Sequence, residues 1–162
     1  ASGEVVIIDP PAPEPEPDPI QLVEHPPEDI DRLWDWIRQD GPDKTKEFDV
    51  ATSVELHAKV AWVRAKEESD ESLMRALYVH GVHVGFVSLY PILHPLAHAH
   101  LYLGPAHRGR GLSIARFAFH LARTARPDLH LVVSTSDSRV ARFAQRVGFT
   151  QTTYLLMEPT DE

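Results

Sequence analysis

The chain has 162 residues, the size of one ordinary domain, and is long enough to bury a core. Hydrophobic residues make up 43% and charged residues 25%, which is typical of a globular protein. Cysteine is absent, which excludes disulfides, thiolate zinc sites and cysteine nucleophiles. No apolar run reaches the ~18 residues of a membrane-spanning helix, and no signal peptide opens the sequence. We therefore expect a cytoplasmic protein, or a component of an assembly formed there, with no membrane partner.

The net charge of −8 is unevenly distributed. Residues 1–50 carry 14 acidic and 4 basic side chains, whereas residues 104–146 carry eight arginines and two acids. The arginine-rich segment favours a phosphate-bearing ligand, and the acidic segment favours a cationic amine. Nucleic acid is not expected as a partner, because the overall negative charge would repel a polyanion.

Residues 1–19 differ in composition from the rest of the chain. Six of the ten residues from Pro10 to Pro19 are proline, and this predicts an extended, polyproline-type acidic arm. The apolar run 5–8 before it is strand-like and is expected to dock on a protein partner or on a second copy of the chain. Residues 20–162 are predicted to form a single domain.

Apolar periodicity predicts the first elements of that domain. A short strand at 21–24 precedes a helix over 28–39, and a second helix spans 51–66. The side chains expected to be buried are Ile30, Leu33, Trp34 and Ile37 in the first helix and Val54, Ala58, Ala61, Trp62 and Ala65 in the second.

The period then changes to that of strands. The later elements are strands at 72–79 and 83–91 joined by a turn at 80–83, a strand at 97–103, a helix at 109–125, a strand at 129–133, a helix at 137–147 and a strand at 152–157. The helix over 109–125 is apolar nearly all round and is expected to be buried. The helix over 137–147 is expected to turn Val140, Phe143, Ala144 and Val147 inward. This order predicts a mixed central sheet flanked by helices.

The segment from Leu101 to Ser113 reads as strand, turn, glycine-rich loop and helix. Glycines let the backbone approach a ligand closely, and the start of a helix offers N–H groups to an anion. Phosphate or pyrophosphate is the expected ligand. A Walker loop is excluded, because Arg110 and Gly111 replace its Lys-Ser/Thr pair. A dinucleotide fingerprint fits poorly, because Ile114 stands where its third glycine belongs.

The run Arg108-Gly109-Arg110-Gly111-Leu112-Ser113 resembles the Gln/Arg-x-x-Gly-x-Gly/Ala loop of the GNAT family of N-acetyltransferases. The segment 137–149, which ends in a Gly-Phe pair, resembles a later helix of that family. The resemblance covers roughly residues 20–157. It implies an α/β (α+β) fold with a mixed sheet of about six to seven strands and about four helices.

The resemblance also implies a function. The family uses acetyl-CoA as co-substrate, and an amine of a small molecule or peptide attacks the thioester directly. The loop would hold the pyrophosphate, and backbone N–H groups on the preceding strand would polarise the carbonyl; no metal is implied. The residues implied in cofactor binding are Leu101, Leu103, Arg108, Gly109, Arg110, Gly111, Leu112, Ser113, Arg139 and Phe143.

The sequence departs from the family pattern at three positions. Ser113 replaces the final Gly/Ala, and Asp137 replaces a frequent asparagine but can still cap its helix. Ala144 stands where many members have a tyrosine proposed to protonate the leaving thiolate. A thiol with a pKa of ~8.5 is a tolerable leaving group without that tyrosine.

The catalytic residues proposed from sequence are histidines and a tyrosine. His98 and His100 alternate on a strand, share a face and titrate near neutrality, so either could take the proton of the amine. Tyr102 is expected on the opposite face, as packing. Tyr154, on the last strand, could replace the missing thiolate acid.

Two other functions stay open at this point. The chain could be a catalytically weak or inactive GNAT-fold adaptor, held in a larger assembly such as a phage particle through residues 1–19, or a sensor that binds acyl-CoA without turnover. A metal site is the weaker interpretation of the histidines, because no carboxylate between His94 and His107 completes a familiar ligand set.

Overall fold

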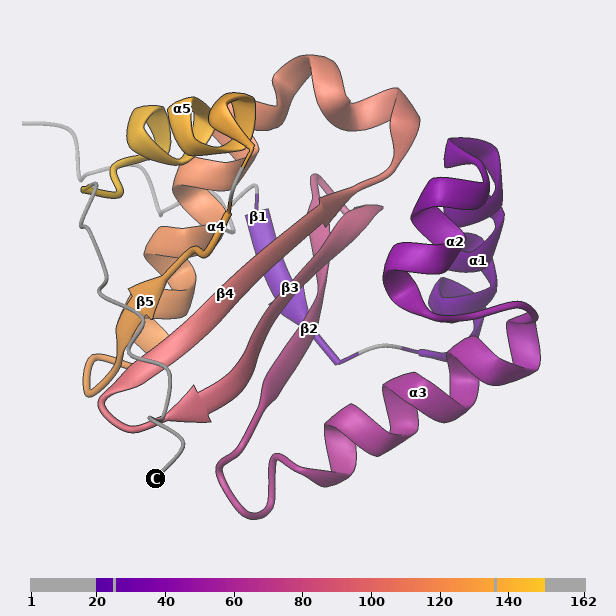
Figure 1. The fold of residues 1–162 in the computed structure, drawn as a ribbon, viewed down its shortest axis with the longest axis horizontal. Helices are drawn as coiled ribbons and strands as arrows, with labels where there is room; N and C mark the ends of the chain where they lie inside the picture. The colour runs from indigo at the N-terminus through magenta and orange to yellow at the C-terminus, as the bar shows by residue number, and fades with distance from the viewer. Residues whose placement is uncertain (1–19, 25, 136, 151–162) are drawn as a thin grey trace, which may run out of the picture.

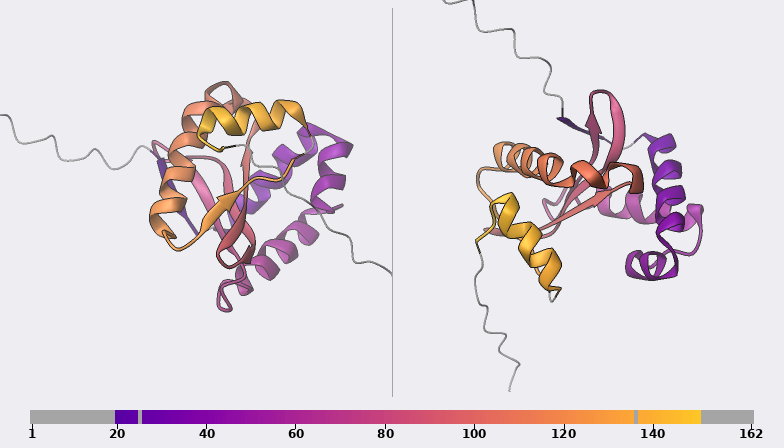
Figure 2. Two further views of the ribbon diagram at one scale, coloured as in Figure 1. Left: turned by 60° about the vertical axis from the view of Figure 1, so that its left-hand side comes forward. Right: turned by 90° about the horizontal axis from the view of Figure 1, so that it is seen from above.

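The computed structural model describes residues 20–24, 26–135 and 137–150. The proposed arm 1–19 and the predicted strand 152–157 with Tyr154 lie outside the described residues. Three helices, α1 (Pro27–Asp40), α2 (Pro42–Phe48) and α3 (Ser53–Ala65), lie on one side of a central sheet (Figure 1). On the other side, α4 (Gly111–Ala125) covers the sheet and α5 (Ser138–Val147) packs beside α4 (Figure 2).

The sheet has five strands among the described residues, in the order β1-β2-β3-β4-β5. They are β1 (Ile20–Val23), β2 (Leu73–Val79), β3 (Val82–Leu93), β4 (Leu96–Leu103) and β5 (His130–Val132). The first four pair antiparallel, and β5 pairs parallel to β4. The predicted mixed α/β sheet is confirmed, with fewer described strands than the expected six to seven. None of the helices in the described ranges is long and apolar enough to cross a membrane.

Helix α2 was not predicted from the sequence. It has seven residues and buries none of them, so it carries no periodic apolar stripe to read. By contrast, a turn between β2 and β3 was predicted, over 80–83. It has only two residues, because β3 begins at Val82, and it places His80 and Gly81 at positive φ of 48° and 76°. Such a turn matches the twist of the two strands it joins.

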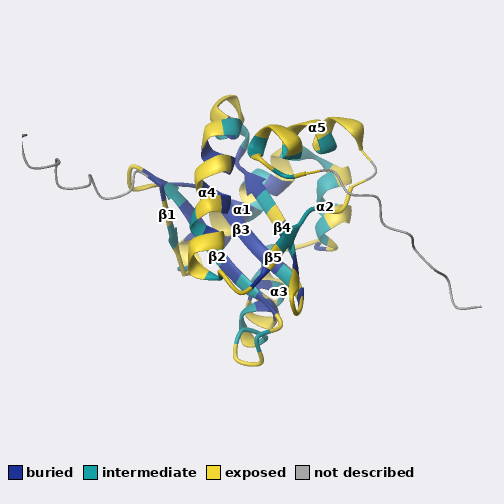
Figure 3. Cartoon of the chain, turned by 90° about the vertical axis from the view of Figure 1, so that its left-hand side faces the viewer, coloured by how far each residue is buried: buried dark blue, intermediate teal, exposed yellow. Residues whose placement is uncertain are grey.

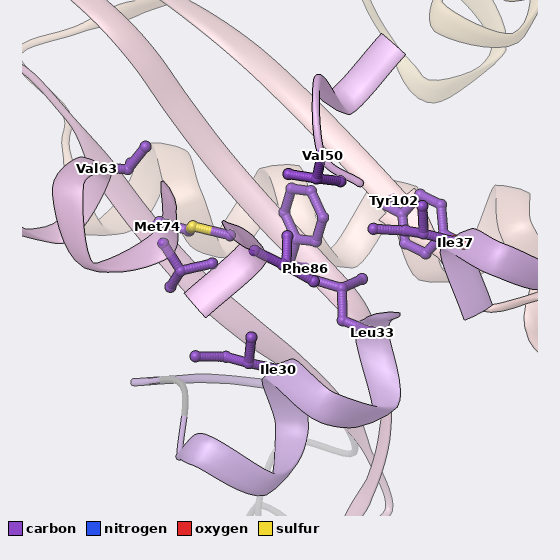
Figure 4. Packing of buried hydrophobic residues seen from close by; sticks show 10 residues of the cluster. Ile30, Leu33, Ile37, Val50, Val63, Met74, Phe86 and Tyr102 are labelled. Atoms are coloured by element: carbon purple, nitrogen blue, oxygen red, sulfur yellow. The ribbon is translucent and has the colours of Figure 1, made fainter. Parts of the chain in front are cut away.

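Two apolar layers hold the helices to the sheet. Between the sheet and the first helices, Leu33 and Ile37 pack with Met74, Phe86 and Tyr102 (Figure 4). On the opposite face of the sheet, two further buried clusters pack against α4. Buried residues therefore follow the strands and the inner faces of the helices, and exposed residues cover the outer faces (Figure 3).

The predicted buried face of α3 was wrong. The helix buries Leu56, Val60 and Val63, whereas Val54 is 77% exposed and Trp62 is 52% exposed. The predicted stripe was rich in alanine. Because stabilisation follows the apolar area removed from water, the larger aliphatic side chains face the core instead.

Helices α4 and α5 are less buried than predicted. Only one face of α4 meets the sheet, and Phe117 on its outer side is 56% exposed. No residue of α5 is fully buried, with Val140 at 43% and Phe143 at 36% exposure. Only the C-terminal end of α5 reaches the core, where Val147 packs against the cluster around Phe119.

Candidate active site

The site predicted from sequence lies where β4 and β5 separate. Within the described residues, their pairing joins only Leu96–His98 to His130–Val132, although β4 continues to Leu103. After β5 the chain turns away toward α5 (Figure 1). The second half of β4 therefore borders a gap between the strands.

Backbone amides of β4 face this gap. The Gly104 N–H donates to the Val84 carbonyl of β3 at 2.8 Å, which shows that this residue directs its amide toward β3. Since amide direction alternates along a strand, Leu101 and Leu103 direct theirs to the opposite edge. The structure thus places the two residues proposed to polarise a carbonyl at the edge of the gap.

The proposed bases lie on the face of β4 that looks toward α1–α3. His100 Nε2 is 3.1 Å from the Tyr90 carbonyl oxygen, and His98 Nδ1 is 3.5 Å from Ser134 Oγ. Tyr102 shares this face and stacks on Phe86, so its predicted opposite orientation was wrong. Residues two apart on a strand point to the same side, which the sequence interpretation overlooked.

The glycine-rich loop forms a 3-10 helix, η1 (Pro105–Arg110), which leads into α4. Gly109 and Arg110 are exposed, whereas Gly111 is buried at the start of α4. A Cβ on Gly111 would lie 3.5 Å from Leu103 Cδ1 and 4.0 Å from Phe143 Cε2. The fold thus brings the loop, the end of β4 and α5 together.

The remaining residues predicted to bind acetyl-CoA lie beside the junction of the loop, β4 and α5. Leu112 is half-buried and Ser113 exposed in the first turn of α4. On α5, the side chain of Arg139 is 88% exposed and lies 3.6 Å from Asp137. Asp137 accepts a hydrogen bond from the Arg139 amide at 2.8 Å, which confirms it as the helix cap.

The guanidinium of Arg110 has no hydrogen-bond or ion-pair partner among the residues that the structure describes. Burial lowers the pKa of the neighbouring His107, and the charge of Arg110 lowers it further. Helix α4 begins directly after Arg110, without a side-chain cap. An unpaired cation at the positive end of a helix is a suitable place for a phosphate group.

Arg108, also predicted to bind the donor, is paired within the protein. Its guanidinium makes two hydrogen bonds to Asp40, at 2.8 and 2.5 Å. The Tyr102 hydroxyl donates to the same carboxylate at 2.6 Å. Arg108 holds the pKa of Asp40 below its ordinary range, and burial followed by this hydrogen bond raises the pKa of Tyr102. Sequence reasoning missed Asp40, because it is 68 residues from Arg108.

A buried polar network supports the loop from below. Asp29 is 1% exposed, accepts hydrogen bonds from Arg32 at 3.0 Å and from the Tyr78 hydroxyl, and lies 3.6 Å from His83. Burial and the Asp29 hydrogen bond raise the pKa of Tyr78 to about 12. The ring of His83 lies 4.9 Å from that of Trp36.

Trp36 connects this network to the loop. Its ring meets the ring of His107 edge-on at 6.0 Å. A Cβ at position 104 would lie 2.7 Å from its Cε2 atom, so Gly104 lets the end of β4 pass close over the indole. Trp36 therefore packs between the buried polar network and η1, and the network supports η1 through this ring.

The buried histidine predicts a dependence of stability on pH. Burial lowers the pKa of His83 below its ordinary value of 6.5. As the pH drops below that value, His83 is protonated in the unfolded chain while it stays neutral in the folded chain. The free energy of unfolding therefore falls as the pH drops. Urea titrations at about pH 7 and about pH 5.5 should show a smaller loss for His83→Gln than for the wild type. Equal losses would contradict this assignment.

The four histidines considered as metal ligands have separate surroundings. His94 Nε2 lies 2.7 Å from Asp70, and His107 packs against Trp36. Across the described part of the chain, no three histidine, aspartate or glutamate side chains are grouped closely enough to hold a metal ion.

The acetyltransferase (GNAT) family model matches residues 24–149, and the chain belongs to this family. This confirms the resemblance inferred from the loop and from the Gly-Phe pair. A comparison with curated protein sequences found no match.

Solved acetyltransferase structures share the fold. The microcin C7 self-immunity acetyltransferase MccE, in complex with acetyl-CoA and AMP, is 17% identical over 81% of this chain and 78% of that chain, with a TM-score of 0.64. A Salmonella typhimurium acetyltransferase that modifies the N-terminal serine of a 50S ribosomal subunit protein is 17% identical over 85% and 87%, with a TM-score of 0.64. A Vibrio cholerae–human chimera of spermidine N-acetyltransferase is 14% identical over 84% and 83%, with a TM-score of 0.63.

Proposed function

We propose that this protein transfers the acetyl group of acetyl-CoA to the amine of a small molecule or peptide. The observation that carries the proposal is the close approach of the end of β4 to the start of α4, where a Cβ on Gly111 would lie 3.5 Å from Leu103 Cδ1. Leu101 and Leu103 direct their amides to the free edge of β4, and Arg110, whose side chain is unpaired among the described residues, stands directly before α4. Family membership supports acetyl transfer with acetyl-CoA as co-substrate.

The residues fit the two ends of such a donor. Arg110 and the first turn of α4 suit the pyrophosphate, and the exposed Gly109 leaves its backbone open, since a Cβ at this position would have nothing within 4 Å. When bound, acetyl-CoA supplies a thioester whose carbonyl carbon an amine attacks directly. The amides of Leu101 and Leu103 can donate to that carbonyl oxygen and stabilise the negative charge that develops there.

His100 and His98 are the proposed acceptors of the proton that the attacking amine loses. His100 uses Nε2 to donate to the Tyr90 carbonyl, so its Nδ1 carries the lone pair that can take a proton. Tyr102 is unsuited to this task, because its raised pKa keeps the hydroxyl protonated and the O–H already donates a hydrogen bond to Asp40.

The acceptor class proposed is an amine-bearing small molecule or peptide. The structural relatives named above modify an N-terminal serine and spermidine, which supports both kinds of acceptor. The acidic residues near the N-terminus attract a cationic amine less strongly than their number suggested. Asp35 pairs with Arg38 at 3.0 Å, and Glu47 with Lys44 at 2.8 Å, so much of their charge is neutralised locally.

The adaptor function remains the alternative prediction from sequence. It depends on residues 1–19, which lie outside the described residues. Ala144 is half-buried on α5 and supplies no acid for the leaving thiolate, as its sequence position indicated. A titration in which the protein does not bind acetyl-CoA would favour this alternative.

Calorimetric titration of acetyl-CoA into the full chain tests the proposal. Arg110→Glu should weaken binding about ten- to hundredfold, because a charge-assisted hydrogen bond is lost and a repulsion is gained. Lys46→Glu on α2 makes the same kind of charge change away from the loop and should leave the dissociation constant unchanged. Arg110 is preferred to Gly111 for this test, because Gly111 is buried against the core residue Leu103.

Two results would contradict the proposal. One is the absence of acetyl-CoA binding by the wild type, and the other is an equal loss of affinity in the Arg110 and Lys46 variants. Wild-type binding that only Arg110→Glu weakens would justify a search for the acceptor by thiol release with a panel of amines.

A further inference from the structure

We infer that the two arginines of the loop have different tasks: Arg110 binds the donor phosphates, whereas Arg108 and Asp40 form a positioning pair that holds the end of β4 in place. This inference rests on the proposed function and deepens it. It changes the role of Arg108 from the one implied by the family resemblance, and it gives a role to Asp40.

All three nitrogen atoms of the Arg108 guanidinium are engaged inside the protein. Nη1 and Nη2 each donate to one oxygen of Asp40, and Nε donates to the Leu103 carbonyl at 3.2 Å. The guanidinium also lies over the ring of Tyr102, 5.7 Å from its centroid. A bidentate pair of this kind fixes the plane and the position of the guanidinium.

Asp40 makes the pair costly to break. Its side chain is only 10% exposed, and it already accepts a hydrogen bond from the Tyr102 hydroxyl. If Arg108 moved to a phosphate, this carboxylate would lose its cation while staying largely buried, which is unfavourable. Arg110 has no such partner within the described chain, so a phosphate gains its charge without breaking an existing ion pair.

The pair joins three elements at the site. Asp40 is the last residue of α1, Leu103 is the last residue of β4, and Arg108 belongs to η1. Leu103 is also one of the two residues whose amides border the gap. With Lys44, Leu101 and Tyr102, the same groups line a cavity of about 320 Å³ on the α1 side of β4. The pair therefore controls how the end of β4 is presented to the part of the donor that carries the acetyl group.

Two ligands, acetyl-CoA and ADP, distinguish an arginine that binds phosphate from one that positions β4. Acetyl-CoA contacts both the loop and the edge of β4, whereas ADP carries a pyrophosphate but no arm that could reach β4. For Asp40→Asn and Arg108→Gln we expect acetyl-CoA to bind about tenfold more weakly, because misplaced amides lose their hydrogen bonds. Binding of ADP, measured by competition, should change by less than about threefold.

If Arg108 were a phosphate ligand, the two substitutions would change the affinity for the probes in opposite directions. Arg108→Gln would weaken ADP and acetyl-CoA alike, as Arg110→Glu is expected to do. Asp40→Asn would release a cation and would tighten both. Either pattern would overturn the positioning role, and so would unchanged acetyl-CoA binding in both variants.

A double variant and an exposed pair complete the design. Asp40→Asn combined with Arg108→Gln leaves no unpaired charge, and it should bind acetyl-CoA no worse than the weaker single variant, because both changes remove one shared interaction. Asp35 and Arg38 form a matched control on α1, 3.0 Å apart with 63% and 62% of their side chains exposed. Asp35→Asn and Arg38→Gln should leave both probes unaffected.

The outcomes also separate this inference from the proposed function. If the wild type fails to bind acetyl-CoA, both are overturned. If the wild type binds and Arg110→Glu weakens both probes, the proposed function is supported, and the behaviour of the Asp40 and Arg108 variants then decides the positioning role alone. Thermal unfolding of each variant, followed by circular dichroism, shows that the titrated chain is folded.

Discussion

Replacing Asp29 with alanine is expected to lower the free energy of unfolding by about 2–3 kcal/mol, because it removes a buried carboxylate that accepts two hydrogen bonds and leaves the Tyr78 hydroxyl without its acceptor. The Asp29 side chain is 1% exposed and accepts hydrogen bonds from both Arg32 and the Tyr78 hydroxyl. Without it, the Tyr78 hydroxyl loses its acceptor and Arg32 loses its carboxylate. Because the network lies beneath Trp36, we also expect weaker packing of η1.

Urea denaturation followed by circular dichroism measures this effect. Asp35→Ala is the matched control, since Asp35 lies on the same helix, pairs with an arginine three residues later and is 63% exposed. That change should alter the free energy of unfolding by no more than about 0.5 kcal/mol. A similar loss in both variants would show that the buried network contributes little beyond a surface pair.

Gly85→Ala is expected to destabilise the fold by about 3 kcal/mol or more, because a Cβ at this position has no room. It would lie 1.8 Å from the Tyr102 carbonyl oxygen and 2.9 Å from the carbonyl carbon, both of which are backbone atoms. Backbone cannot rotate away as a side chain can, so β3 and β4 would have to separate. The separation would occur beside Leu103, and acetyl-CoA binding should weaken together with stability.

Gly109→Ala is the control for this prediction. Apart from its chain neighbours, no atom of the described residues lies within 4 Å of a Cβ at position 109, and its backbone has no positive φ. Its free energy of unfolding should stay within about 0.5 kcal/mol of the wild type. If Gly85→Ala is as stable as Gly109→Ala, the close approach of β3 to β4 is not tight in solution.

Periodicity predicted the elements with long apolar patterns well. Of the predicted stripe, Ile30, Leu33 and Ile37 are buried and Trp34 is half-buried. The strands at 72–79, 83–91 and 97–103 match β2, β3 and β4. Periodicity failed for α3, because alanines and larger aliphatic residues formed two competing stripes. It also failed for α2, because a short polar helix is set by turn geometry at its ends and has no buried stripe.

The chemistry of the loop was readable from local sequence. Glycines, arginines and the start of a helix are consecutive in the chain, so their spacing alone predicted a phosphate site. The GNAT family assignment supports a phosphate-bearing co-substrate, and its placement on this loop stays a prediction. The proposed role of Leu101 and Leu103 came from the family resemblance, whereas their position at a free edge of β4 was decided by the short pairing of β4 with β5.

Which arginine is available for a ligand was decided by tertiary structure. Arg108 and Arg110 are equivalent in any local reading of the loop, but α1 brings Asp40, 68 residues away, against Arg108 and leaves Arg110 unpaired. A buried carboxylate requires a cation, and only the packing of α1 against β4 determines which cation it meets. The residue types therefore predicted a kind of ligand, whereas the contacts between distant elements determined which arginine of the loop is left unpaired among the described residues.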